Sequence, residues 1–134
     1  MPERYTFDSE PILAFYSGEE GAEVVEGILK QIQDGLAEGN MSIINLTEVR
    51  YILDRLDPNL PEEIERKIRL FGIRIVAVDD DGLWREAADV KSKHPMSLAD
   101  AFAVATAKAF KAKLVVGSDK EFEGAGANLL RIRK

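Results

Sequence analysis

The chain has 134 residues, of which 46% are hydrophobic, and a formal net charge of −6. This length suits one domain with a real core, so we expect a single unit over residues 1–134, and the negative charge argues against indiscriminate binding to nucleic acid. The lack of cysteine excludes disulfides, thiolate metal sites and cysteine nucleophiles, and the single histidine, His94, excludes mechanisms that need two histidines.

The N-terminal residues lead directly into a strand-like segment at 5–7, without the charged and apolar regions of a signal peptide. No apolar run in the sequence approaches the roughly 20 residues that a membrane helix requires. We therefore expect a cytoplasmic protein that makes no contact with a membrane.

Predicted strands and helices alternate along the chain. Apolar runs at 5–7, 41–44, 73–78 and 114–116 are typical of buried strands, and 129–132 would add an edge strand. Helical spacing of apolar residues covers 12–36, 45–56, 62–71, 83–90 and 98–112, with Pro61 suited to a first helical turn and Gly72 to a helix end. Strands joined by helices predict a mostly parallel sheet. The fold class is therefore α/β, a three-layer α/β/α sandwich.

Two aspartates follow predicted strands, at the sheet edge where open parallel sheets bind ligands. Asp8 comes directly after the strand at 5–7, and Asp119 follows the strand at 114–116 after Gly117 and Ser118. Each aspartate alone is equally typical of a turn or a helix cap, because its carboxylate bonds nearby backbone amides. Together, however, they would meet at one edge of the sheet.

Two further acids lie near the starts of predicted helices. Glu48 falls just outside its helix's apolar stripe and can lean over the sheet edge, although a favourable position in the helix dipole explains it equally well. Asp100 has the capping-box spacing from Ser97, yet the alanine-rich helix after it permits close approach to the sheet. All four acids would then converge.

Four converging carboxylates would make a site of hard oxygen ligands, which suits Mg²⁺ or Mn²⁺. Two such ions can activate water on one side of a phosphodiester and stabilise the leaving oxygen on the other. Bound cations would also offset the negative charge, and local basic residues such as Arg50 and Lys91 could contact a nucleic-acid backbone. The pattern thus indicates metal-dependent hydrolysis of phosphodiester bonds.

Four motifs hold these acids: Phe7-Asp8-Ser9, Asn45-Leu46-Thr47-Glu48-Val49, Ser97-Leu98-Ala99-Asp100-Ala101 and Ser118-Asp119-Lys120-Glu121-Phe122. Over residues 5–122 they resemble the PIN-domain family, and within it the small VapC-like toxin ribonucleases. The resemblance implies a five-stranded parallel sheet, RNA cleavage with Mg²⁺ or Mn²⁺, a homodimer, and a cognate antitoxin that covers the active site. Carried over by position, the metal-binding and catalytic carboxylates would be Asp8, Glu48, Asp100 and Asp119. Ser9 and Ser118 would support them, and Glu121 would be an additional acid.

Two positions depart from the family pattern. Glu10-Pro11 replaces the small residues usual after the first motif, and Gly117 stands where threonine or an apolar residue is common. These departures bear on access of the substrate to the site. They leave the four acids intact.

Other functions use similar residues. A metal-dependent DNA nuclease or phosphatase could use the same carboxylates, and a binding module could keep the fold without activity. A phosphoacceptor receiver domain fits less well, because it needs an acidic pair near the first strand where this chain has only Asp8, and Lys120 is a poor substitute for its lysine. The acidic run 79–81 is better suited to capping a helix.

Overall fold

The computed structural model describes residues 2–134 and contains five strands and six α-helices, with a pair of helices after each of the first three strands. In chain order the elements are β1 (Glu3–Phe7), α1 (Ser9–Ser17), α2 (Ala22–Gln33), β2 (Ala37–Ser42), α3 (Ile43–Leu56), α4 (Leu60–Phe71), β3 (Arg74–Val76), α5 (Asp81–Lys93), α6 (Leu98–Phe110), β4 (Lys113–Val116), the short 3-10 helix η1 (Lys120–Phe122) and β5 (Asn128–Arg131).

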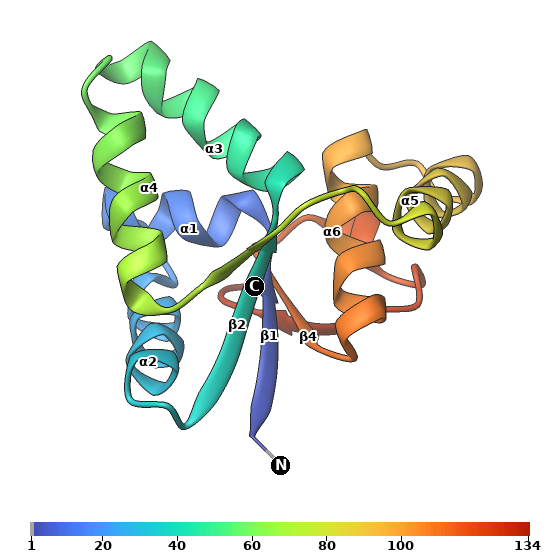
Figure 1. Cartoon of the computed structure of the whole chain (residues 1–134), viewed down its shortest axis with the longest axis horizontal. Coiled ribbons are helices and arrows are strands. Elements are labelled where there is room, and N and C mark those ends of the chain that lie inside the picture. The colour runs from blue at the N-terminus through green and yellow to red at the C-terminus, as the bar shows by residue number, and fades with distance from the viewer. Residues whose placement is uncertain (1) are drawn as a thin grey trace.

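The strands form one parallel sheet in the order β3-β2-β1-β4-β5. Helices α1, α2 and α4 lie on one side of it and α5 and α6 on the other (Figure 1), so the predicted three-layer α/β/α sandwich is confirmed. Helices α3 and α4 form a hairpin that rises beyond the carboxyl edge of the sheet (Figure 1). Because β1 is central and paired on both sides, the residue after it, Asp8, lies in the middle of that edge.

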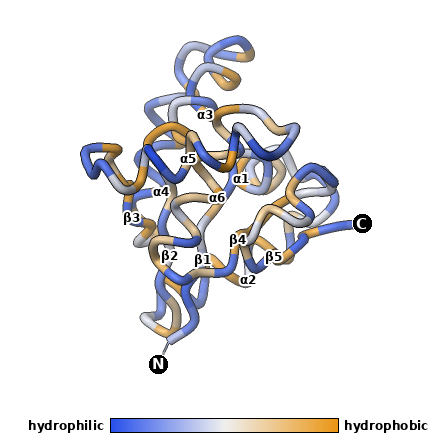
Figure 2. Tube along the Cα trace, turned by 90° about the vertical axis from the view of Figure 1, so that its right-hand side faces the viewer, coloured by the Kyte–Doolittle hydropathy of each residue, from blue (hydrophilic) through white to orange (hydrophobic). Residues whose placement is uncertain are grey.

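Helix α6 packs directly across strands β1, β2 and β4. Seven consecutive residues of this helix, 101–107, are buried, and four of them are alanines. Small side chains let a helix backbone approach a sheet closely, which is the approach that the alanine-rich sequence predicts. The tube around α6 and the neighbouring strands is coloured largely toward the hydrophobic end of the scale (Figure 2). This packing brings the start of α6 to the carboxyl edge.

The region of helical spacing over 12–36 forms two helices with a turn between them. Gly18 ends α1 with a φ of 68°, and Gly21 precedes α2 with a φ of 94°. Both angles lie in the left-handed region that glycine adopts without a steric penalty. The turn folds α2 back against α1.

The strand predicted at 41–44 begins earlier and ends earlier in the structure, at Ala37–Ser42. Ile43 and Ile44 are helical instead, because the Ser42 hydroxyl accepts a hydrogen bond from the Ile44 amide at 3.1 Å and caps α3. The strand predicted at 73–78 is likewise shorter, at Arg74–Val76.

Two predicted helix boundaries are confirmed. Pro61 lies in the first turn of α4, and Gly72 ends that helix with a φ of 103°. Within residues 2–134, no helix combines the length and the apolar composition that crossing a membrane would require.

Candidate functional site

Asp8 lies at the carboxyl end of β1, where its backbone amide donates to the Val115 carbonyl at 3.0 Å. Its side chain is 4% exposed. Burial raises the pKa of the Asp8 carboxyl well above its usual range, and the nearby charges of Asp100, Glu48 and Asp119 raise it further. The four predicted acids therefore interact electrostatically at one place.

The side chain of Asn45 joins the starts of three helices. Its Nδ2 donates to Asp8 Oδ1 at 3.3 Å, to Ser9 Oγ at 3.3 Å and to the Ala99 carbonyl at 3.2 Å. Ser9 Oγ in turn donates to the Asn45 carbonyl at 3.1 Å. The polar links between α1, α3 and α6 thus hold Asp8 beside the first turn of α6.

Asp100 is the third residue of α6, and its backbone amide donates to Ser97 Oγ at 3.1 Å. The predicted cap by Ser97 is therefore confirmed. The Asp100 carboxyl is half-buried, and burial is the main cause that raises its pKa to about 6. The charges of Asp119, Glu48 and Glu121 raise this pKa as well, whereas a hydrogen bond from Ser97 lowers it. Asp100 can therefore take part in the helix cap through its backbone amide and in the acidic site through its carboxyl.

Asp119 and Glu121 come from the short turn that follows β4. Asp119 Oδ1 accepts a hydrogen bond from the Glu121 amide at 2.9 Å and caps η1. Phe122, 1% exposed, anchors the turn in the core beneath it. One carboxylate oxygen each of Asp100, Asp119 and Glu121 lies within 4.8 Å of the others.

The predicted residues are brought together to different degrees. Glu121, predicted only as an additional acid, belongs to the closest group of carboxylates with Asp100 and Asp119. Glu48, half-buried in the second turn of α3, raises the pKa of both Asp8 and Asp100 but lies outside that closest group, as does Asp8. Of the two predicted hydroxyl supports, Ser9 is buried in the Asn45 network whereas Ser118 is exposed.

Two further residues at the site were not predicted from the sequence. Asn45 is fully buried, and its signal was a polar residue on the core-facing side of α3, one turn before the buried Val49. Arg131 of β5 donates to the carbonyls of Gly117 and Asp119. Its contacts are to backbone atoms of a distant segment, so no sequence pattern reveals them.

Among the described residues, no lysine or arginine forms a salt bridge with the five acidic side chains. Within residues 2–134, salt bridges join surface acids to lysine or arginine at many places, but none includes Asp8, Glu48, Asp100, Asp119 or Glu121. Carboxylate oxygens clustered without a neutralising side chain are the donor set of a hard divalent cation. The residues present therefore fit Mg²⁺ or Mn²⁺.

Comparison with solved structures shows the same fold in bacterial toxin–antitoxin assemblies. DNA-bound VapBC from Salmonella typhimurium has a TM-score of 0.76 at 14% identity, over 98% of this chain and 99% of that one. VapBC2 from Rickettsia felis, bound to a promoter DNA fragment, has a TM-score of 0.74 at 14% identity, over 96% and 98% of the two chains. A Klebsiella pneumoniae toxin–antitoxin complex gives 0.68 at 19% identity, over 96% and 97%.

No curated protein matches the chain. The family comparison, in contrast, spans nearly its whole length. Residues 5–128 match the PIN domain, from the strand before Asp8 to the start of β5. The chain belongs to the PIN-domain family.

Proposed function

We propose that the protein is a metal-dependent endoribonuclease and the toxin of a toxin–antitoxin pair, acting in the cytoplasm. The observation that carries this proposal is the cluster of carboxylates at the carboxyl edge of a PIN-domain sheet, which forms no salt bridge among the described residues. Such a cluster weakens the metal-free fold by mutual repulsion and becomes favourable once a cation enters.

Asp8, Glu48, Asp100 and Asp119 would hold Mg²⁺ or Mn²⁺, with Glu121 as an additional ligand. When bound, the divalent cation supplies positive charge that activates water and stabilises the oxygen that leaves phosphorus. Asp8 is held in place by Asn45, and Asp100 by the cap of its helix. These contacts keep the ligands in position before the substrate arrives, which reduces the cost of reorganisation during the reaction.

The proposed partner is a cognate antitoxin. Its support is that the solved structures with this fold include toxin–antitoxin complexes from several bacteria. The proposed substrate, RNA, rests on the resemblance to VapC-like toxins.

A DNA nuclease or a phosphatase using the same carboxylates is the alternative enzyme. Incubation of the purified protein with RNA and with single-stranded DNA, each with and without Mn²⁺, separates these activities. We expect RNA cleavage that requires Mn²⁺. Cleavage of DNA alone would favour a DNA nuclease, and no cleavage of either would favour a phosphatase or a silent binding module.

The acidic run 79–81, the residues that most suggest a receiver domain, lies at the start of a helix. Asp80 of the acidic run caps α5, since its Oδ1 accepts from the Gly82 amide at 2.7 Å. This run lies after β3, at the edge of the sheet, whereas Asp8 follows the central β1. Since β2 separates β3 from β1, this arrangement does not favour a receiver site.

Added Mg²⁺ or Mn²⁺ is expected to raise the melting temperature of metal-free protein, because an ion that binds only the folded state stabilises it by mass action. Thermal melts across a millimolar titration test this, with Na⁺ at equal ionic strength as the control. The gain should shrink below pH about 6, where the Asp100 carboxyl becomes protonated and competes with the cation. Unchanged melting curves would contradict a cation site.

The protein is also expected to form a homodimer. The family resemblance motivates this, together with Leu56, which is 71% exposed at the end of α3. Phe15 and Tyr16, which the sequence also suggests as surplus apolar residues, instead pack against the core. Light scattering at micromolar concentration should give about twice the mass of one chain, and a monomer would refute the expectation.

A further inference from the structure

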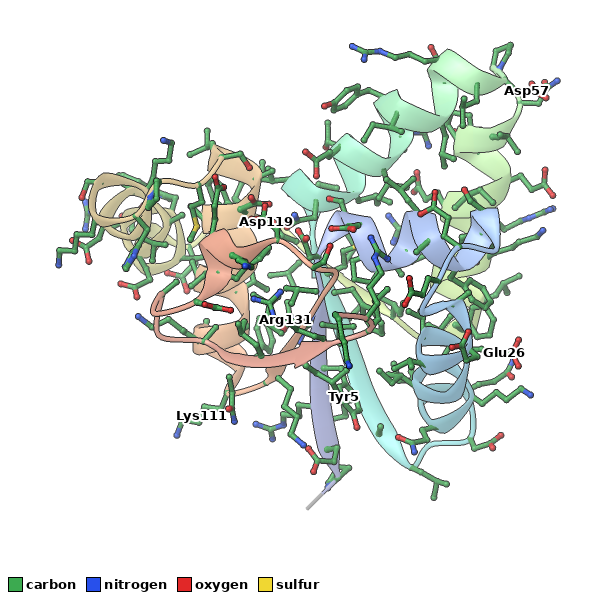
Figure 3. All side chains as sticks on the ribbon, turned by 180° about the vertical axis from the view of Figure 1, so that it is seen from behind. Tyr5, Glu26, Asp57, Lys111, Asp119 and Arg131 are labelled. Atoms are coloured by element: carbon green, nitrogen blue, oxygen red, sulfur yellow. The ribbon has the colours of Figure 1, made fainter. Side chains whose placement is uncertain are left out.

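Arg131, the last residue of β5, contacts the loop that carries Asp119. Its Nη1 donates to the Gly117 carbonyl and to the Asp119 carbonyl, each at 3.0 Å. Figure 3 shows the two labelled side chains, Asp119 and Arg131, on neighbouring segments of the C-terminal part of the chain. The guanidinium thus bridges both ends of the three-residue loop 117–119.

This contact is directed at the backbone of the loop. Arg131 also approaches a carboxylate oxygen of Glu123, but at 3.4 Å, and Glu123 is mostly exposed. An exposed ion pair of this kind contributes little to stability. Charge-assisted hydrogen bonds to two carbonyls, made by a planar and rigid group, restrict geometry much more.

The strand that carries Arg131 is itself fixed. Arg131 lies opposite Val116 in the β4–β5 ladder, and the next residue, Ile132, donates from its amide to the Val116 carbonyl at 3.0 Å. Ile132 is 5% exposed, and its side chain lies against Gly21. The guanidinium therefore extends from a strand that is held in place by backbone pairing and by the buried Ile132.

A second side chain, Glu10, lies against the same loop at Gly117. The Glu10 carboxylate occupies the space in which a side chain at Gly117 would stand, and it pairs with Arg133. Arg133 also donates to the Glu20 carbonyl at 3.1 Å. The two departures from the family pattern, Glu10 and Gly117, are thus one packing arrangement: the glycine makes room for the glutamate.

We propose that Arg131 is a positioning residue of the carboxylate site, which holds the loop 117–119 so that Asp119 meets Asp100 and Glu121. The proposal rests on the metal-dependent function proposed above. Side chains that orient metal ligands in this way typically change metal affinity or activity by about 10- to 100-fold when they are replaced.

Positioning and charge predict opposite results for the same substitution. Arg131 is a cation near a group of carboxylates, so its charge opposes the entry of another cation. If charge were its only effect, Arg131→Ala would tighten Mn²⁺ binding and Arg131→Lys would leave it unchanged. If Arg131 positions the loop, both variants bind Mn²⁺ more weakly, because both contacts come from one nitrogen of a planar, rigid guanidinium, whereas lysine keeps the charge on a shorter and flexible side chain.

The experiment is a calorimetric titration of Mn²⁺ into metal-free wild type, Arg131→Ala, Arg131→Lys and the control Arg69→Ala, with RNA cleavage measured in parallel. Arg69 pairs with Glu65 on α4, away from the site, so its loss removes an equal charge without a contact to the loop. Thermal melts ensure that each titration is made on folded protein. We expect the dissociation constant to rise about 10-fold for Arg131→Ala, by a smaller factor for Arg131→Lys, and not for Arg69→Ala.

Unchanged or tighter Mn²⁺ binding by folded Arg131→Ala, with an active wild type, would overturn the positioning role alone. A wild type that neither binds Mn²⁺ nor cleaves nucleic acid would overturn the proposed function, and the positioning role with it. A loss of thermal stability without a change in Mn²⁺ affinity would show that Arg131 serves only the fold, which also overturns the proposal.

Discussion

Replacement of Asp100 by asparagine is expected to lower Mn²⁺-dependent RNA cleavage by about 10²-fold or more, comparable to the loss of another key electrostatic group. Asparagine keeps the shape of the side chain, and the Ser97 cap survives because the Asp100 backbone amide is its donor. What disappears is one anionic oxygen of the closest carboxylate group. Cleavage of a fluorescent RNA by both proteins at saturating Mn²⁺ gives the measurement.

The same substitution should stabilise the metal-free protein at neutral pH. The folded-state pKa of Asp100 is raised to about 6, so its contribution to stability is fully present below the unfolded pKa and is lost as the pH rises through about 6. A neutral amide in place of this carboxylate would avoid both the burial of a charge and the repulsion by Asp119 and Glu48. Metal-free Asp100→Asn is therefore expected to melt higher than wild type at pH 7.5 and to gain less from Mn²⁺.

A purely structural role for Asp100 predicts the reverse. If its charge only favoured the helix start, the variant would lose stability and keep nearly full activity. Asp81→Asn is the matched control, since Asp81 is also an acid in a first helical turn, on α5, and is exposed. A destabilised but fully active Asp100→Asn protein would remove Asp100 from the proposed site.

The sequence predicts the fold class well where chain-local signals agree with tertiary packing. Strand β4 and helices α4 and α6 appear where apolar spacing, Pro61 and Gly72 place them. Strand β2 begins earlier than predicted, at Ala37. The prediction missed its first residues, Ala37 to Asn40, because they have little intrinsic strand preference. They form a strand because β1 pairs with them on one side, and such pairing is a long-range effect.

The candidate site was likewise predictable in part, from local sequence signals, and in part depends on long-range packing. The four acids could be located because they follow strands or open helices, and the topology of a parallel sheet then brings them to one edge. Which of the carboxylates lie closest to one another could not be predicted. Glu121 reaches the closest group because Asp119 caps a 3-10 turn and Phe122 anchors it, which sets the direction of the neighbouring side chain.

Substitution of Asp8 by asparagine should give the largest change in the pH dependence of stability. Burial and three neighbouring acids raise the pKa of Asp8 well above its usual range. The metal-free wild type should thus keep the stability contributed by Asp8 below the unfolded pKa and lose it as the pH rises through the folded one. Asparagine is neutral at every pH and still accepts the hydrogen bond that Asn45 Nδ2 donates to Oδ1.

Metal-free Asp8→Asn and wild type are therefore expected to melt at similar temperatures near pH 4, and the variant should melt progressively higher as the pH approaches 8. Titrating groups that do not interact with Asp8 cancel, because the comparison is the difference between the two proteins at each pH. Asp100, Glu48 and Asp119 do interact with Asp8, and the relief of their repulsion changes the difference in the same direction. Asp34→Asn serves as the control, since it removes the same charge from an exposed residue at the end of α2. Mn²⁺ should reverse the order at pH 8, because only wild type presents the buried carboxylate to the cation. A stability difference that stays constant from pH 4 to pH 8 would show that burial of the Asp8 charge does not oppose folding, and the cation would then have no uncompensated charge to neutralise there.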